Sequence, residues 1–448
     1  MVAKSAREIA LNILVDVNEK GAYSNIAIYK HLQNSMDKRD ENLVREIVYG
    51  VLENRLYIDY IISKVSKIKL KKLSALILEI LRIGVYQIVF MDRIPDSAAV
   101  NESVNLSRKY SHKGTLGYVN GVLRNISRNK EELIKINKNN VSEYLSTKYS
   151  HPKWIVDRWL KEYGEKFTEE LCIANNQKPK LNVRVNILKT SREDLKERLT
   201  NKGYDVIETK YSHYGLIIEN PYRITELDEF RKGYFTIQDE SSMLVSQIMN
   251  PEKDSLVVDA CSGPGGKATH MAEIMDNKGK IISRDVYEHK IKLIEDNCKR
   301  LGIDIIETQI QDACAIDEYL VNKADYLLID APCTGFGLIR RRPEIKWNRE
   351  EKDINNLLSV QKDILNTCSK YLKVGGILIY STCTIISEEN INMIRNFLKD
   401  NKDFKLMGFK ELIKEDQNLS EAENGYIQLF PNISGTDGFF IAKMKKIN

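Results

Sequence analysis

Short apolar runs alternate with longer amphipathic stretches over the second half of the chain. Continuous apolar runs of four to eight residues predict buried parallel strands, and the amphipathic stretches between them predict helices. The expected strands are 256–260, 280–285, 304–308, 325–330 and 376–381, and the expected helices are 266–276, 287–301, 353–372 and 387–399. This alternation predicts a doubly wound, Rossmann-like α/β sheet, which an antiparallel pair at 425–430 and 438–443 closes.

The first half has a different pattern. Up to about residue 135, apolar residues recur at helical spacing and no alternating strand pattern appears, which predicts an all-helical domain. Residues 130–150 are rich in Asn and Lys and predict a linker. Strand-like alternation at 181–186, a helix capped by Ser191 and a second strand near 214–219 predict a small α+β module. We therefore expect three parts: 1–135, 150–235 and 236–448.

Composition narrows the class of protein. A chain of 448 residues with 42% hydrophobic and 29% charged residues fits a multidomain globular protein with a sizeable core. No apolar run approaches the ~18 residues that a membrane span needs, and the charged N-terminus is unlike a signal peptide, so we expect a cytoplasmic location without a membrane partner. The seven cysteines are scattered, which argues against a disulfide framework or a metal site. Four are expected to be small buried residues: Cys172, Cys298, Cys314 and Cys368.

Charge is unevenly distributed. Residues 1–140 hold 23 Lys/Arg and 15 Asp/Glu (net +8), whereas the remainder holds 45 and 48 (net −3). One basic cluster spans 64–72 and a second spans 108–130, with Tyr110 and Tyr118 nearby. These features fit an anionic partner and stacking against bases, although exposed helix faces with half-buried tyrosines explain them equally well.

A glycine-rich turn follows the expected strand 256–260. It lacks the glycine and hydroxyl residue of a phosphate-binding loop and does not match the dinucleotide fingerprint. Asp285 ends the next strand 22 residues after Gly263 (285 − 263 = 22), the spacing at which a carboxylate accepts ribose hydroxyls. Asp312, after the third strand, is expected at the adenine edge. With Asp259 and Asp330 ending two further strands, the pattern predicts an adenosine pocket. Its predicted residues are Cys261, Ser262, Gly263, Pro264, Gly265, Gly266, Lys267, Asp285, Asp312 and Asp330.

Two cysteines stand 50 positions apart, each after an apolar run (383 − 333 = 50). If both runs are parallel strands, Cys333 and Cys383 emerge at the same carboxyl edge, where ligands bind in open α/β sheets. A nucleotide-type pocket flanked by two thiols points to methyl transfer onto a pyrimidine.

The chain resembles a known family at these residues. The glycine turn, Asp330-Ala331-Pro332-Cys333 and Ser381-Thr382-Cys383 are similar to the RNA cytosine-5 methyltransferases that use S-adenosylmethionine, in particular the RsmB (Sun/Fmu) family of 16S ribosomal RNA enzymes. Segments 81–87 and 117–125 resemble that family's NusB-like RNA-binding domain. The family's turn more often has Ala at the position of Gly263 and Thr at that of Ala268, which affects only the expected cofactor affinity.

The resemblance implies roles for the site residues. Cys383 would attack carbon 6 of cytosine, and Cys333 would assist release of the product. Asp330 would bind the Watson–Crick edge of the base, and Lys267 would line the pocket between base and cofactor. A helix expected to start near Ser387 would favour the Cys383 thiolate. Three arginines are expected to contact RNA phosphates, with a solvated loop as the alternative: Arg340, Arg341 and Arg342.

Other functions remain open from the sequence. The same chemistry could act on transfer RNA or another RNA. A DNA cytosine methyltransferase fits less well, because that group uses the Pro-Cys thiol as nucleophile and lacks the Thr-Cys partner. A non-catalytic RNA-binding assembly or antitermination factor is opposed by the presence of both Cys333 and Cys383. Neither the modified nucleotide nor an oligomeric state is implied.

Overall fold

The computed structural model describes residues 5–32, 36–414 and 417–448. Contacts divide the chain into two compact units. The first unit is 1–177 with 339–351, and the second is 178–338 with 352–448. The predicted domain boundaries near residues 135, 150 and 235 stay a prediction. The helices α9 and α10, which follow residue 135, belong to the first unit.

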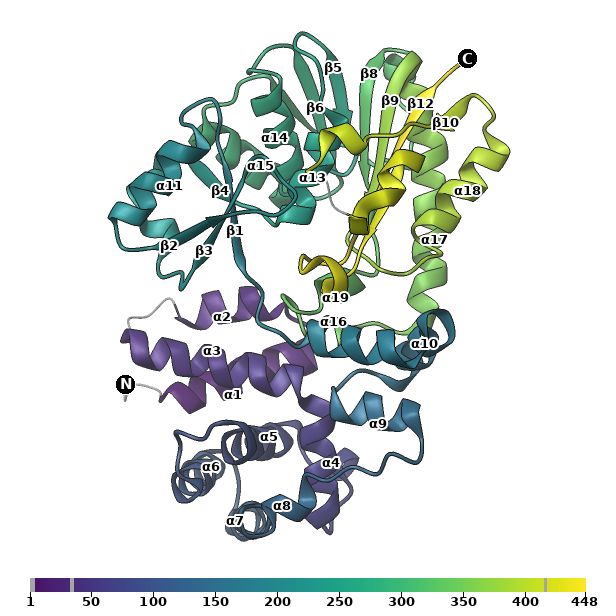
Figure 1. The fold of residues 1–448 in the computed structure, drawn as a ribbon. Coiled ribbons are helices and arrows are strands. Elements are labelled where there is room, and N and C mark those ends of the chain that lie inside the picture. Colours follow the sequence, from purple (N-terminus) through teal and green to yellow (C-terminus); the bar gives the residue numbers. More distant parts are fainter. Residues whose placement is uncertain (1–4, 33–35, 415–416) are drawn as a thin grey trace. The chain divides into compact units, whose positions relative to one another are not determined.

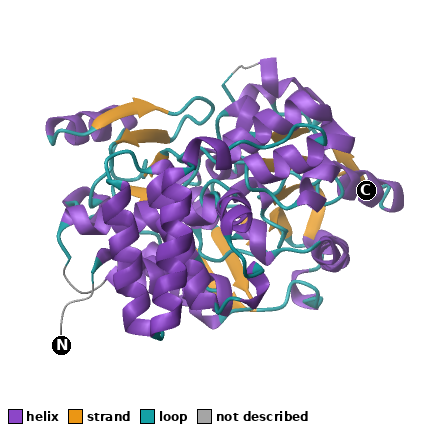
Figure 2. Cartoon of the chain, turned by 90° about the horizontal axis from the view of Figure 1, so that it is seen from below, coloured by secondary structure: helices purple, strands orange, loops and turns teal. Residues whose placement is uncertain are grey.

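Helices supply all regular secondary structure that the structure describes in the first unit. Figure 2 colours the helices of the chain purple and its strands orange. Ser5 caps the first helix by accepting a hydrogen bond from the Glu8 backbone N–H at 3.3 Å, and Gly21 ends it at φ 67°. The α-helices are α1 (Ala6–Lys20), α2 (Ser24–Leu32), α3 (Lys38–Glu53), α4 (Arg55–Val65), α5 (Ala75–Phe90), α6 (Asp96–Tyr110), α7 (Lys113–Arg128), α8 (Lys130–Leu133), α9 (Val141–Lys148), α10 (Lys153–Asn175) and α16 (Ile345–Asn348). The expected linker at 130–150 thus contains two helices, α8 and α9.

An apolar core holds this unit together. Helix α5 is buried along most of its length and packs against α1, α3, α6 and α7. Gly50 of α3 lets the Tyr86 ring of α5 approach, because a Cβ at position 50 would lie 1.9 Å from that ring. The predicted helical character of the amino-terminal third is confirmed over the described residues.

The second unit begins with a small antiparallel sheet. Its strands are β1 (Leu181–Val185), β2 (Asp205–Glu208), β3 (Gly215–Glu219) and β4 (Phe235–Ile237), in the order β2-β3-β1-β4. Helices α11 (Arg192–Asn201) and α12 (Asp228–Arg231) accompany them, and Ser191 caps α11 as predicted, at 3.0 Å from the Asp194 backbone N.

Strand β1 is buried on both faces, although its alternating sequence predicted a half-buried strand. The Arg184 side chain is fully buried and forms an ion pair with Glu273, also fully buried, at 2.8 Å. The same guanidinium donates to the Gly266 carbonyl at 2.5 Å and to Thr269 Oγ1 at 3.0 Å. The polar face of β1 is therefore covered by α14 (Gly266–Ile274).

A mixed sheet forms the rest of the second unit. Over the described residues it has eight strands in the order β10-β12-β9-β8-β5-β6-β7, with β11 paired to β12. The strands from β5 to β9 are mutually parallel, and β10, β11 and β12 are antiparallel to their neighbours. The strands are β5 (Leu256–Asp259), β6 (Lys280–Asp285), β7 (Ile306–Ile310), β8 (Ala324–Asp330), β9 (Leu372–Thr382), β10 (Phe404–Leu406), β11 (Tyr426–Leu429) and β12 (Phe439–Lys446).

Helices cover both faces of this sheet (Figure 1). Successive strand residues point to opposite faces, so Val257 and Val258 belong to different apolar clusters. One cluster includes α13 (Glu240–Met249), α14 and α15 (Glu288–Leu301), and the other includes α17 (Glu351–Cys368) and α18 (Ile391–Asp400). The predicted Rossmann-like architecture is confirmed, together with its closing antiparallel pair.

Candidate active site

The strand order reverses at β5. From β5 the chain proceeds to β6 and β7 on one side, and later to β8 and β9 on the other. Ligands of doubly wound sheets bind outside the carboxyl ends of the strands at such a reversal. Asp259, Asp285, Asp330 and Thr382 are the last residues of β5, β6, β8 and β9, so four predicted or neighbouring site positions meet at this edge.

The glycine turn joins β5 to α14 and is fixed by neighbouring backbone. The Ser262 N–H donates to the Arg284 carbonyl at 2.7 Å, and Gly265 has φ +93°, which favours glycine. The Gly263 N–H donates to Asp285 Oδ2 at 3.1 Å. A Cβ at Gly263 would lie 2.6 Å from that oxygen and 2.5 Å from Lys290 Cδ, so the turn lies directly against the Asp285 carboxylate.

Asp285, the predicted ribose ligand, lies at the end of β6 against the glycine turn. Its side chain is 5% exposed and also forms an ion pair with Lys290 at 3.1 Å, while the Tyr287 backbone N–H donates to Oδ1 at 3.1 Å. Asp312 is exposed, and its Oδ1 accepts a hydrogen bond from the Cys314 backbone N–H at 2.9 Å. The Asp285 carboxylate is therefore hydrogen-bonded to the glycine turn. The Asp312 carboxylate instead accepts a hydrogen bond from the backbone of its own loop.

Burial raises the pKa of two side chains at the end of β5: Asp259, the last residue of the strand, and Cys261, a predicted pocket residue. Asp259 is 1% exposed, and burial raises the pKa of its carboxyl group to about 7. Burial also raises the pKa of the Cys261 thiol well above its usual value, so this cysteine stays protonated. Cys261 packs against the apolar core of one sheet face.

Lys267 and Asp330 form an ion pair at the carboxyl edge. Lys267 Nζ lies 2.6 Å from Asp330 Oδ2, and Ser381 Oγ donates to Asp330 Oδ1 at 2.7 Å. Burial disfavours the ammonium ion, but the Asp330 carboxylate outweighs it and raises the pKa of Lys267. Lys267 Nζ also lies 5.4 Å from the centre of the Phe439 ring. Ser381 and Phe439 received no role from the sequence, because Ser381 meets Asp330 through the pairing of β8 with β9, and Phe439 lies on β12, which pairs with the other side of β9.

The two thiols meet at this edge. Cys333 Sγ and Cys383 Sγ are 3.2 Å apart, although 50 residues separate them in the chain. Their loops are connected by the backbone as well, since the Gly337 N–H donates to the Cys383 carbonyl at 3.0 Å. The hydrogen bond to Cys383, together with burial, raises the pKa of the Cys333 thiol well above its usual range. Cys333 therefore keeps its proton.

The helix expected near Ser387 begins later. Helix α18 starts at Ile391, eight residues after Cys383 (391 − 383 = 8), and the intervening residues form a loop with short turns. The predicted helix start at 387 is therefore wrong, and stabilisation of a Cys383 thiolate by a helix dipole stays a prediction.

The three arginines expected at RNA phosphates lie in the first unit. Arg340 is 7% exposed and donates to the Ala174 carbonyl at 3.3 Å, which leaves little of its guanidinium for an RNA phosphate, so the expectation is corrected for Arg340. Arg341 and Arg342 are partly exposed, and Arg342 lies over the Tyr23 ring at 5.3 Å. RNA contacts by Arg341 and Arg342 remain predictions.

The cysteines outside the site follow the expected pattern with one exception. Cys172, Cys298 and Cys368 are buried, but Cys314 is exposed. Within residues 5–32, 36–414 and 417–448 no group of three or more His, Cys, Asp or Glu side chains is arranged to hold a metal ion. In the same residues no helix combines the length and hydropathy that crossing a membrane requires.

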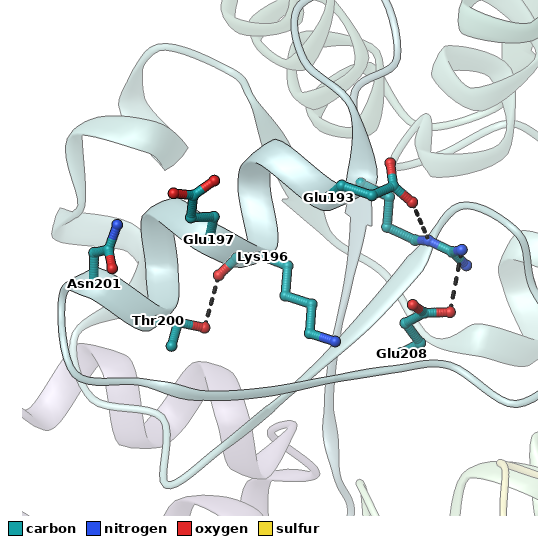
Figure 3. A pocket seen from close by; sticks show the side chains of 7 residues that line it. Glu193, Lys196, Glu197, Thr200, Asn201 and Glu208 are labelled. Atoms are coloured by element: carbon teal, nitrogen blue, oxygen red, sulfur yellow. Dashed lines mark hydrogen bonds and ion pairs between the residues drawn. The ribbon is translucent and has the colours of Figure 1, made fainter.

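A surface hollow in the small α+β module contains none of the predicted site residues (Figure 3). It lies along α11 and β2, and Arg192 pairs there with Glu208 at 3.1 Å and with Glu193 at 3.6 Å. Three of its charged side chains, Arg192, Glu193 and Glu208, pair with one another, and we assign the hollow no ligand.

Comparison with protein families matches three parts of the chain. A model described as 16S rRNA methyltransferase RsmB/F matches residues 246–445, a NusB family model matches 4–128, and a RsmF/B-like ferredoxin-like domain matches 151–225.

Individual relatives match over their whole length. A probable ribosomal RNA small subunit methyltransferase B from Bacillus subtilis is 36% identical over 100% of both chains, and its Synechocystis counterpart is 33% identical over 99% of both. The crystal structure of PH0851 has a TM-score of 0.83 at 28% identity, covering 99% of this chain and 100% of that one. A methyltransferase homolog from Pyrococcus horikoshii has a TM-score of 0.61 at 30% identity, covering 69% of this chain and 100% of that one. The chain therefore belongs to the RsmB/F family of 16S rRNA methyltransferases.

Proposed function

We propose that this protein methylates carbon 5 of a cytosine in 16S ribosomal RNA, in the cytoplasm, through a covalent bond between Cys383 and the base. The observation that carries the proposal is the contact of 3.2 Å between the Cys333 and Cys383 sulfur atoms, beside the Lys267–Asp330 ion pair. The ribosomal substrate is supported by family membership and by the relatives' names.

The cofactor proposed is S-adenosylmethionine, which supplies a methyl group from its sulfonium and leaves as S-adenosylhomocysteine. The residues at the β5–α14 turn fit such a group. The Gly263 N–H and the Asp285 carboxylate lie together at this turn, and Asp285 Oδ1 keeps a lone pair for a ribose hydroxyl beside the hydrogen bond that it accepts from the Tyr287 N–H. We propose that Cys261, Ser262 and the turn through Lys267 line this pocket, and that Asp312 contacts the adenine edge.

Carbon 5 of cytosine is a weak nucleophile. Addition of a thiolate to carbon 6 makes it a stronger one. The Cys383 thiolate adds to carbon 6, and the electron pair of the 5,6 double bond then becomes available at carbon 5 for the incoming methyl group. Asp330, oriented by Lys267 and Ser381, holds the Watson–Crick edge of the base. After methylation a base removes the carbon-5 proton, the freed pair restores the double bond, and Cys383 leaves as a thiolate. The Cys333 S–H group stabilises that leaving thiolate by a hydrogen bond, and each turnover releases one proton.

The helical unit is proposed to position the RNA. The chain up to residue 140 carries a net charge of +8, and residues 4–128 match the NusB family. Lys67, Lys69, Lys71 and Lys72 are exposed, as phosphate contacts require.

The division of labour between the thiols tests this function. Cys383→Ala cannot form the adduct and should neither methylate nor crosslink 16S RNA. Cys333→Ala should attack, transfer the methyl group and stall, which leaves RNA attached through Cys383. The stalled species should appear as a shifted band in denaturing electrophoresis and vanish in the double variant.

Two outcomes contradict the proposal. A band trapped in Cys383→Ala would exchange the two roles, and adduct-free loss of activity in both single variants would remove the covalent assignment.

Mapping 5-methylcytosine in 16S ribosomal RNA from cells with and without the protein tests the substrate. If cells without the protein lose a 5-methylcytosine from transfer RNA and none from 16S ribosomal RNA, the substrate would be transfer RNA.

A further inference from the structure

Two consecutive side chains behind the thiols, Glu389 and Asn390, have no role in the chemistry described above. They lie between β9 and α18, and both are 0% exposed. Polar side chains of this kind are costly to bury unless hydrogen bonds satisfy them, so their partners indicate what they hold in place.

Glu389 holds the loop that carries Cys333. Its Oε2 accepts a hydrogen bond from the Thr334 backbone N–H at 2.9 Å, and its Oε1 accepts one from the Thr334 hydroxyl at 2.5 Å. Gln361 Nε2 donates to Glu389 Oε2 at 2.9 Å and to the Pro332 carbonyl at 2.9 Å. The residues on both sides of Cys333 are therefore tied, directly or through Gln361, to one carboxylate.

Asn390 holds the loop that carries Cys383 in the same way. The Thr382 hydroxyl donates to Asn390 Oδ1 at 2.5 Å, and Asn390 Nδ2 donates to the Thr384 carbonyl at 3.0 Å. Nδ2 also donates to Gln428 Oε1 at 2.7 Å, which anchors the amide to β11. The residues before and after Cys383 are thus bound to a single amide.

The two loops are joined between these anchors. Thr334 Oγ1 and Thr384 Oγ1 are 2.8 Å apart, one residue beyond each cysteine. Because Glu389 and Asn390 are neighbours in the chain, the distance between the loops they hold is limited by one peptide unit. The contact of 3.2 Å between the sulfur atoms is consistent with this constraint.

We propose that Glu389 and Asn390 are positioning residues, one for each thiol: Asn390 places Cys383 for attack on the base, and Glu389 places Cys333 for its release. This inference rests on the proposed covalent function, because the two thiols need separate placement only if they act at separate steps. Neither residue contacts the substrate in this role, and both act through the hydroxyl and backbone groups of Thr334, Thr382 and Thr384.

The hydrogen bonds to Glu389 come from uncharged groups, so the geometry needs acceptors rather than a negative charge. A glutamine at 389 keeps one carbonyl acceptor for the Thr334 N–H, and its amide can donate to the Thr334 hydroxyl, which then donates to Thr384. Glu389→Gln is therefore the matched control, with the same volume and an equivalent set of partners.

The test measures attack and release separately in the full-length protein. Attack is the rate at which a covalent RNA band appears under single-turnover conditions, and release is the rate at which that band disappears as methylated RNA forms. Misplacement of a reacting group costs roughly 10- to 100-fold. Glu389→Ala should slow release by about that factor and accumulate the adduct, whereas Asn390→Ala should slow attack without accumulation. Glu389→Gln should stay within about threefold of the unmodified protein in both steps.

Folding is checked by melting temperature and by calorimetric affinity for S-adenosylmethionine. If an alanine variant fails either check, Thr334→Val and Thr382→Val replace it. They remove only the hydroxyl that meets Glu389 or Asn390, and should show the release and attack defects respectively.

The outcomes separate this inference from the proposed function. If Cys333→Ala traps no RNA, the proposed assignment of Cys383 as the attacking thiol fails, whatever the variants at 389 and 390 do. If Cys333→Ala traps RNA but the variants at 389 and 390 lower attack and release in equal proportion, the positioning roles are overturned and the function stands. A release defect in Glu389→Gln as large as that in Glu389→Ala would also overturn the inference, because the charge would then be what matters.

Discussion

Arg184 connects the small α+β module to the cofactor turn, and its removal should have a large effect. Its guanidinium forms two hydrogen bonds with Glu273, at 2.8 and 3.0 Å, and further ones with Gln238, Thr269 and the Gly266 carbonyl. Both members of the ion pair are fully buried. Arg184→Met keeps an unbranched apolar stem but removes every one of these donors.

The size of the expected loss of stability follows from the Glu273 carboxylate, which stays buried without its partner. Removing one partner of a buried pair costs about 3–5 kcal/mol, because the remaining ion is buried without compensation. The second unit has 258 residues (161 + 97), and a domain of roughly that size loses about 2–4 °C in melting temperature per kcal/mol. We therefore expect its melting temperature to fall by roughly 6–20 °C.

The loss should depend on pH in a defined direction. Burial raises the pKa of Glu273 above its usual value even with Arg184 beside it. A carboxyl group with a raised folded-state pKa contributes stability that is present below its unfolded pKa and is lost as pH rises through the folded value. Without Arg184 the folded pKa rises further. The difference in unfolding free energy between variant and unmodified protein should therefore be largest near pH 8 and shrink towards pH 5.

Thermal melts and urea titrations across that pH range measure this effect. The control is Arg184→Met combined with Glu273→Leu, which removes both charges and should recover most of the lost stability. A single variant within about 1 kcal/mol of the unmodified protein at all pH values would refute the reasoning, and so would a double variant no better than the single one.

Three further predictions concern the cofactor and the RNA. Asp285→Ala should weaken S-adenosylmethionine binding by roughly 1.5–3 kcal/mol in calorimetry, and unchanged affinity would remove Asp285 from the pocket. Gly263→Ala should also weaken S-adenosylmethionine binding, because the new Cβ would lie 2.5 Å from Lys290 Cδ and 2.6 Å from Asp285 Oδ2. Adding Lys290→Ala should recover part of the lost affinity. If it recovers none, the clash with Lys290 is excluded as the cause. Glutamine at Lys67, Lys69, Lys71 and Lys72 should reduce the salt dependence of RNA affinity by up to about one unit of slope per lost phosphate contact, whereas an unchanged slope would place the RNA elsewhere.

The sequence was sufficient for the elements that carry the site. Five apolar runs became parallel strands within a few residues of their predicted bounds, and the meeting of Cys333 with Cys383 followed from the topology of two adjacent strands. Local patterns specify such strands because burial on both faces requires continuous apolar residues.

The features that the sequence did not reveal depend on contacts between distant segments. Arg184 follows an alternating pattern that normally indicates a solvent face, but α14 covers that face and Glu273 neutralises the arginine. Helix α18 starts later than predicted because the Asn390 backbone is not helical (φ −110°, ψ −111°), and the Asn390 side chain binds the loop that carries Cys383. Arg340 appeared to be a loop residue, and its burial depends on Ala174, 166 positions away.

The first unit cannot be completed until late in translation, because it includes a segment from the second half of the chain. That unit includes residues 339–351, where Trp347 Nε1 donates to the Leu52 carbonyl at 3.0 Å and Lys346 Nζ donates to the Glu53 carbonyl at 2.9 Å. After Gln177 is added, 174 more residues must follow before Glu351 exists (351 − 177 = 174). At 5–20 residues per second this takes roughly 9–35 s. Although its helices are translated first, the unit is completed only when most of the chain has been synthesised, so a product truncated before residue 339 lacks part of both units.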